Sequence, residues 1–147
     1  MGYSTYFEGR FKLNNKLDDE TYEFLQALSC TRRMKRDVDP KYGVEGEFYV
    51  EGGGMCGQDK EDNIINYNQP PKTQPSLWCD WVPTPDRMHI EWNKGEKFYN
   101  YIEWIKYIII KILAPKGYIL NGKVTYQGED THDNGVIQIT NNIVTNT

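Results

Sequence analysis

The chain has 147 residues, a net charge of −4 and a sequence pI of about 5.2. One domain with one core fits this length, and the acidic balance argues against non-specific binding to duplex DNA. Apolar residues make up only 38% of the chain, but 14% are aromatic and can bury a large area per residue. We therefore expect one folded domain over residues 1–147, with fraying of the Asn- and Thr-rich residues 144–147.

The first part of the chain predicts a strand, a helix and a second strand. Residues 3–13 alternate between apolar and polar side chains, which is the period of a half-buried strand. Asp18 is a suitable N-cap, and acidic residues follow it in the first turn of a predicted helix. This helix is expected to end near residues 33–36, where cations suit the helix dipole. Residues 46–50 predict the second strand.

A long loop over residues 51–76 comes next, and it is rich in glycine, proline, amide and aromatic residues. Such a composition is typical of a binding surface rather than of a catalytic centre. Residues 77–82 and 88–92 then predict two strands that form a hairpin around a proline-containing turn. The long loop is therefore the first candidate for a functional segment.

A second helix is predicted after Asn93, which is a candidate N-cap. Apolar residues recur at helical spacing over residues 98–112 and give this helix a core-facing side. Pro115 is expected to stop it. Residues 118–126 and 136–140 predict two last strands, which are joined by an acidic turn.

The predicted elements follow the order β-α-β-β-β-α-β-β. Each element carries one apolar side, and a largely antiparallel sheet with both helices on one face buries all of these sides together. The sequence therefore predicts a single α+β domain, without internal repeats and without a linker between domains.

The sequence lacks the motifs of common catalytic sites. Cys30, Cys56 and Cys79 have neither CxxC spacing nor a histidine partner, so we expect free thiols rather than a zinc site. A nucleophile elbow and a phosphate-binding loop are both missing. We expect no cofactor. Without a signal peptide or a bilayer-spanning run, the predicted location is the cytoplasm, which is the host cytoplasm for a phage-encoded chain.

A cluster of cations follows the first predicted helix: Arg32, Arg33, Lys35 and Arg36. Guanidinium groups match phosphate oxygens with two parallel hydrogen bonds, so the arginines are candidates for binding a nucleotide or a nucleic-acid end. The alternative is a solvated helix end, where the dipole favours cations. Four cations exceed what the dipole requires, so both interpretations stay open.

Aromatic and amide residues gather in and after the long loop. A nucleobase is recognised by stacking together with amide hydrogen bonds, and a protein partner mainly by tryptophan, tyrosine and arginine. Trp78 and Trp81 lie three apart in a predicted strand and point to opposite faces, so at most one belongs to the core. The candidate binding residues are Gln58, Tyr67, Gln74, Trp78 and Trp81, together with Arg32, Arg33 and Arg36.

The acidic turn between the last two predicted strands contains Glu129, Asp130 and Asp133. Carboxylates in one loop can bind Mg²⁺ or Ca²⁺, which would suit a metal-dependent hydrolase. Their spacing fits neither an EF-hand nor a two-metal pattern. The alternative is a solvated hairpin.

Aromatic residues also widen the apolar surface of the second predicted helix beyond one stripe. They are Tyr99, Trp104 and Tyr107. A helix of this kind is either buried on two sides or meets a partner. A homodimer through these three residues is one such arrangement, and it requires that they be exposed in the monomer.

Five segments have a distinctive composition: Gly2–Thr5, Thr31–Asp37, Gln74–Cys79, Gly95–Tyr99 and Gly128–Asp130. Together they resemble a family of short, largely uncharacterised proteins of bacteriophages and bacterial mobile elements, over nearly the whole chain. The resemblance implies no catalytic residue. It implies a setting in which small proteins bind a component of the host, defence systems included.

These observations predict a non-enzymatic accessory protein that acts by stoichiometric binding of a host protein, with counter-defence as the implied role. Two alternatives stay open: a protein that binds a nucleotide or a nucleic-acid end, and a metal-dependent hydrolase. A concave, arginine-lined pocket would favour the nucleotide. A flat aromatic patch would favour the protein partner.

Overall fold

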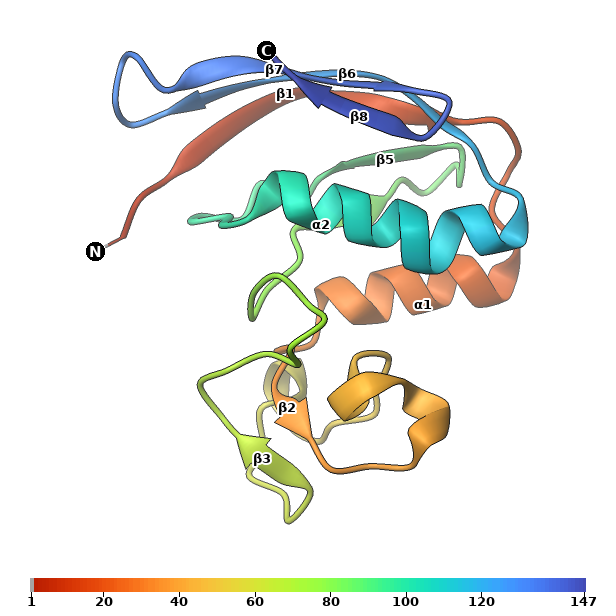
Figure 1. Cartoon of the computed structure of the whole chain (residues 1–147), viewed down its shortest axis with the longest axis vertical. Coiled ribbons are helices and arrows are strands. Elements are labelled where there is room, and N and C mark those ends of the chain that lie inside the picture. Colours follow the sequence, from red (N-terminus) through yellow and green to blue (C-terminus); the bar gives the residue numbers. More distant parts are fainter. Residues whose placement is uncertain (1) are drawn as a thin grey trace.

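The computed structural model describes residues 2–147. Its main layer is an antiparallel six-stranded sheet in the order β4-β5-β1-β6-β7-β8, and both helices lie on one side of it (Figure 1). The predicted α+β class, with a mostly antiparallel sheet and two helices on one face, is confirmed. The elements are β1 (Thr5–Leu13), α1 (Asp19–Ser29), β2 (Lys35–Arg36), β3 (Ile64–Asn66), β4 (Trp81–Pro83), β5 (His89–Trp92), α2 (Tyr101–Ile108) with a following π-helical turn (Ile109–Leu113), β6 (Leu120–Gly128), β7 (Asn134–Thr140) and β8 (Ile143–Asn146).

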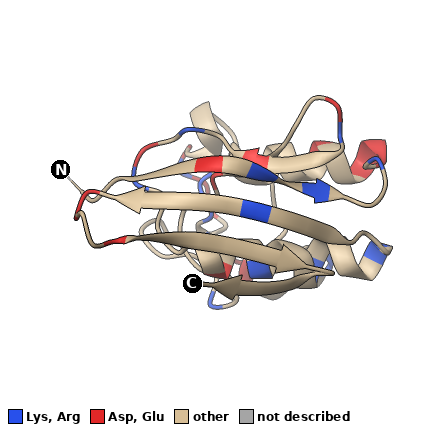
Figure 2. Ribbon diagram, turned by 90° about the horizontal axis from the view of Figure 1, so that it is seen from above, with Lys and Arg blue, Asp and Glu red and all other residues tan. Residues whose placement is uncertain are grey.

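Strand β1 organises the sheet, because it pairs along its full length with β6 and also pairs with β5. Its alternating side chains place Phe7, Phe11 and Leu13 in the core between the sheet and the helices. The polar side chains of the same strand lie on the open face of the sheet. Acidic and basic positions are interspersed along the strands of the sheet (Figure 2). The face therefore has no continuous positive charge that would attract the phosphate backbone of a nucleic acid.

Between α1 and β4 the chain leaves the main sheet and forms a region of short elements, residues 30–80, which we call the insert lobe (Figure 1). It contains the two-stranded β2-β3 sheet and three short 3-10 helices. The predicted strand over residues 46–50 is wrong. Gly46 is the last residue of a 3-10 helix (Val44–Gly46), and a turn at residues 47–48 follows it. The φ of Gly46, 77°, lies outside the usual range of a strand.

Helix α1 begins as predicted, since the Asp18 side chain accepts a hydrogen bond from the Thr21 backbone N–H at 2.7 Å. Its predicted extension to residues 33–36 is wrong, because α1 ends at Ser29. The Ser29 and Thr31 hydroxyls donate to carbonyls of the last turn, at 2.8 and 2.7 Å. These bonds satisfy backbone carbonyls that would accept from further backbone N–H groups if the helix continued.

Helix α2 begins at Tyr101 rather than directly after Asn93. The intervening segment cannot be helical, because Lys94, Lys97 and Asn100 have φ values of 68°, 60° and 58°. The segment forms an irregular loop, residues 93–100, which packs beside the insert lobe.

The C-terminal residues 144–147, for which we predicted fraying, are paired with β7 in the structure. Asn141 and Asn142 have φ values of 47° and 70°, which is the backbone of a two-residue hairpin turn. Strand β8 therefore returns beside β7, and Thr147 exchanges two backbone hydrogen bonds of 3.0 Å with Val136. The asparagine pair is the sequence signal for this hairpin.

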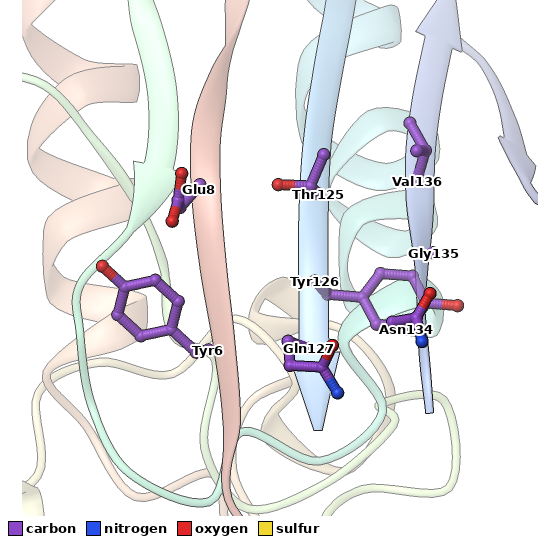
Figure 3. Close-up of a pocket in the computed structure, with 8 residues that line it drawn as sticks. All are labelled: Tyr6, Glu8, Thr125, Tyr126, Gln127, Asn134, Gly135 and Val136. Carbon is purple, nitrogen blue, oxygen red and sulfur yellow. The ribbon is translucent and has the colours of Figure 1, made fainter. Parts of the chain in front are cut away.

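A shallow hollow of about 370 Å³ lies on the sheet where β1, β6 and β7 run side by side (Figure 3). Tyr126 lies opposite Gly135 in the β6-β7 register, and its hydroxyl donates to Asn146 Oδ1 at 2.9 Å. A methyl group at position 135 would lie 2.7 Å from the Tyr126 hydroxyl and closer still to the Thr147 carbonyl. Glycine therefore lets the tyrosine ring cross β7.

The substitution Gly135→Ala is expected to lower the free energy of unfolding by about 1–3 kcal/mol, because the added methyl overpacks this crossing. Equilibrium urea unfolding measures the change. In a Tyr126→Phe background the same substitution should cost less, since the crowding hydroxyl is gone. Equal costs in the two backgrounds would show that Tyr126 is not the group that requires glycine.

Candidate binding site

Arg33 is part of the predicted basic cluster but is buried, with 1% of its surface exposed. Its Nη2 donates to the carbonyls of Glu47 and Tyr49, at 3.0 and 2.8 Å, and Nε donates to Gln74 Oε1 at 3.4 Å. Burial lowers the pKa of Arg33 to about 10. The structure thus places Arg33 inside the insert lobe, where Nε and Nη2 bind lobe atoms and Nη1 is buried without a partner among the described residues.

Arg36 is equally buried. Its Nη1 donates to Glu61 Oε1 and Asn63 Oδ1, both at 2.8 Å, and its guanidinium lies 4.8 Å from the centre of the Tyr49 ring. Gln74 is also buried and donates to the Glu47 carbonyl at 2.6 Å. Arg36 and Gln74, which were predicted to bind a ligand, thus lie inside the insert lobe and support it.

Three other predicted residues form a small cluster on the lobe. The Arg32 guanidinium lies 4.5 Å from the centre of the Tyr67 ring and donates to the Tyr67 carbonyl at 3.1 Å. The Tyr67 hydroxyl donates to Gln58 Oε1 at 3.2 Å. Arg32 also donates to Asn68 Oδ1 at 3.4 Å. All three side chains are half-buried, so the cluster is partly accessible but is already satisfied by internal contacts.

The two tryptophans have different environments. Trp81 is 1% exposed and packs against Phe7, Phe11 and Phe98 in the core, with ring centres 5.3 to 5.6 Å away. Its indole N–H donates to the Tyr101 carbonyl at 2.9 Å. The structure therefore places Trp81, a predicted binding residue, in the core rather than on a binding surface. Trp78 is half-buried and lines a surface pocket.

This pocket, which we call the Trp78 pocket, lies between the insert lobe and the 93–100 loop. Its volume is about 730 Å³, within the range typical of ligand-binding clefts. Two aromatic residues, Trp78 and Tyr99, and three carboxylate or ammonium side chains line it. The complete lining is Asn68, Pro70, Pro75, Ser76, Leu77, Trp78, Asp80, Gly95, Glu96, Lys97, Tyr99 and Asn100.

The 93–100 loop that forms one wall holds unusual backbone geometry. The positive φ of its non-glycine residues costs free energy, and such strain concentrates at functional sites. The loop is pinned at both ends: Asn93 Oδ1 accepts from the Gly95 N–H at 2.7 Å, and the Tyr99 hydroxyl accepts from the Tyr3 N–H at 3.0 Å. The wall is thus held in one shape before any ligand arrives.

Asp80 is a buried carboxylate in the pocket lining, with 8% of its surface exposed. Burial raises the pKa of Asp80, and a hydrogen bond from the Asn93 side chain partly opposes this shift. Among residues 2–147, no cationic side chain lies within 4 Å of its oxygens. Gly95 makes room for Asp80, because a Cβ there would lie 2.9 Å from Asp80 Oδ2.

The three acidic residues predicted as metal candidates form hydrogen bonds with the N-terminal segment. Asp133 Oδ2 accepts from the Tyr3 hydroxyl at 2.6 Å, and Glu129 accepts from the Ser4 backbone N–H. The Asp130 N–H donates to the same Tyr3 hydroxyl at 3.0 Å. In the described part of the chain, no three His, Cys, Asp or Glu side chains gather as a metal site. The acidic turn instead fastens the N-terminal segment to the end of β6.

The predicted dimer surface is also largely internal. Trp104 is fully buried and Tyr107 is 7% exposed, so the expectation that they are exposed in the monomer is wrong. Trp104 Nε1 donates to Ser76 Oγ at 2.7 Å, and the Tyr107 hydroxyl donates to Glu47 Oε1 at 2.6 Å. These two residues connect α2 to the insert lobe. Tyr99 is 47% exposed and belongs to the Trp78 pocket.

Comparison with protein-family models, with curated proteins and with solved structures found no match to this chain. Within residues 2–147, neither helix has the length and apolar composition that crossing a membrane requires. The interpretation of the site therefore rests on the chemistry of its residues.

The sequence identified Trp78 as a binding residue but did not identify Asp80 or the 93–100 loop. An acid set between Cys79 and Trp81, directly before β4, is the signal that could have identified the buried carboxylate.

Proposed function

We propose that this chain is a non-enzymatic binding protein that acts by stoichiometric association with a host protein, and that the Trp78 pocket is the centre of its interface. The observation that supports this most directly is a concave surface lined by Trp78 and the exposed Tyr99. Tryptophan and tyrosine dominate the energy of protein interfaces when they sit at the centre of a packed site. The resemblance to phage proteins suggests counter-defence as the role.

The charges of the pocket favour a protein over a nucleotide. Asp80 and Glu96 are acidic and Lys97 is the one cation in the lining. A phosphate would meet net repulsion there, and the arginines that were expected to bind it are engaged elsewhere, in the lobe. The pocket is concave, but no arginine lines it, so it lacks the cations that a nucleotide site was expected to have. The proposal of a cytoplasmic protein partner therefore rests on the aromatic lining and the charge of the site rather than on its shape.

A photo-crosslinking amino acid placed at position 99 tests this proposal in the cytoplasm of the bacterial host. We expect one host protein to be captured from position 99 and not from position 6. Tyr6 is a matched control, because it is 58% exposed and lies on the open face of the sheet. Capture of the same protein from both positions, or of none from position 99, would contradict the proposal.

The captured partner, once purified, allows a quantitative prediction. The substitution Tyr99→Ala should weaken binding at least tenfold, because it removes an aromatic wall of the pocket, whereas Tyr6→Ala should change it less than about twofold. Isothermal titration calorimetry gives both affinities and the stoichiometry, which we expect to be equimolar. A nucleotide that co-purifies with the wild-type chain and is lost on Trp78→Leu would instead indicate a nucleotide site.

A further inference from the structure

The buried Asp80 carboxylate has no positive partner within the described residues, which is unusual for a buried acid. Lys97 lines the same pocket but does not reach it, and the Lys97 methylenes pack beside Gly2 instead. A cation that enters the pocket from another molecule would supply the charge partner that Asp80 lacks.

The chain itself shows how it holds arginine. Arg36 lies over the Tyr49 ring at 4.8 Å and pairs with the Glu61 carboxylate. Arg87 likewise lies over the Tyr22 ring, at 4.4 Å, and pairs with an aspartate at the start of α1. In both places an aromatic face and a carboxylate bind the guanidinium together.

The Trp78 pocket offers the same two elements. Trp78 and Tyr99 supply aromatic rings, and Asp80 and Glu96 supply carboxylates. None of the residues that line the pocket is an arginine. Its chemistry is therefore that of an arginine site whose guanidinium must come from another molecule.

We propose that the Trp78 pocket receives an arginine side chain from a basic segment of the partner protein. This inference rests on the proposed function and names the chemistry that the pocket recognises. Arginine fits better than lysine, because its planar guanidinium stacks on aromatic rings, pairs with a carboxylate through two hydrogen bonds and is less strongly hydrated. The net charge of −4 also favours the approach of a basic partner.

The test uses a probe that needs no knowledge of the host protein: the tripeptide acetyl-Gly-Arg-Gly-amide. Its counterpart with citrulline has nearly the same shape without the charge. NMR follows the indole N–H signal of Trp78, which is assigned with the Trp78→Phe variant. We expect a saturable shift of this signal with the arginine peptide and an affinity at least tenfold lower with the citrulline peptide. The lysine peptide should bind with intermediate affinity.

Two variants distinguish the contribution of the Asp80 carboxylate to binding from an effect on folding. Asp80→Asn should lower the affinity for the arginine peptide at least tenfold. Glu8→Gln, on the open face of the sheet, should leave this affinity unchanged. Trp78→Leu keeps Asp80 and should also weaken binding, which isothermal titration calorimetry measures because this variant lacks the indole signal. The proposal therefore stays testable if Asp80→Asn folds poorly. The far-ultraviolet circular dichroism of each variant reports its fold.

Equal binding of the arginine and citrulline peptides, or full affinity in Asp80→Asn, would overturn the arginine inference. Guanosine that binds more tightly than the arginine peptide and displaces it would also overturn it, in favour of a nucleobase site. Each of these results leaves the crosslinking test at position 99 unaffected. A host protein captured there, together with a failed arginine test, would keep the proposed function and reject only this reading of the pocket.

Discussion

Replacing Arg33 by methionine is expected to lower the free energy of unfolding by about 3–5 kcal/mol, a large part of the stability of a domain of this size. Methionine fills much of the volume of the arginine side chain but donates no hydrogen bond. The Tyr49 carbonyl and Gln74 Oε1 would then lose their donor, whereas the Gly46 and Glu47 carbonyls keep the Tyr49 backbone N–H and Gln74 Nε2. A buried acceptor left without a partner costs about 1–3 kcal/mol.

Equilibrium urea unfolding of Arg33→Met and of a matched variant, Arg32→Met, gives the comparison. Arg32 precedes Arg33 in the chain but is only half-buried, so its replacement should cost about 1 kcal/mol. Arg33→Lys should fall between the two, because an ammonium cannot reproduce the fork of the guanidinium. Similar costs for Arg32→Met and Arg33→Met would mean that the carbonyl network around Arg33 does not hold the insert lobe.

The sheet and the helices could be predicted because their signal is periodic. The alternation along β1 and the cap at Asp18 are local patterns, and they determine the element whatever lies around it. The single covered face follows from the need to bury one apolar side of each element, whereas the order of strands in the sheet was not predicted.

The insert lobe could not be predicted in the same way. Its structure depends on buried arginines that bind carbonyls distant in the sequence, and a cluster of arginines looks the same whether it faces solvent or carbonyls. The lobe and the 93–100 loop also use positive φ at non-glycine residues such as Glu45, Cys56 and Lys97, which no composition rule reveals.

The candidate site was predictable only in part for a related reason. Trp78 was identified because aromatic residues in a loop rich in proline and amides are typical of binding surfaces. Tyr99 was assigned to a dimer helix, because the loop that carries it was predicted to be helical. Asp80 was missed because burial of an acid is decided by tertiary packing. The pocket therefore combines one residue found from composition with others that only the fold brings together.

The two tryptophans of this region provide the second large prediction. Trp81→Ala should lower the free energy of unfolding by about 3–5 kcal/mol, because it empties the space between Phe7, Phe11 and Phe98 and removes the indole bond to the Tyr101 carbonyl. Trp78→Ala should cost about 1 kcal/mol or less, since its side chain is already partly solvated. Far-ultraviolet circular dichroism during urea unfolding measures both changes without relying on tryptophan fluorescence.

The same pair separates stability from binding. Trp78→Ala should abolish binding of the arginine peptide, measured by isothermal titration calorimetry, in a chain that remains folded. Trp81→Phe keeps an aromatic ring in the core and should retain that binding at a cost of about 1–3 kcal/mol in stability. A stability loss at Trp78 as large as that at Trp81 would assign Trp78 to the core and remove the aromatic wall on which the binding proposal depends. The converse result, with a stable Trp78→Ala that no longer binds, would assign the loop tryptophan to recognition and the strand tryptophan to folding.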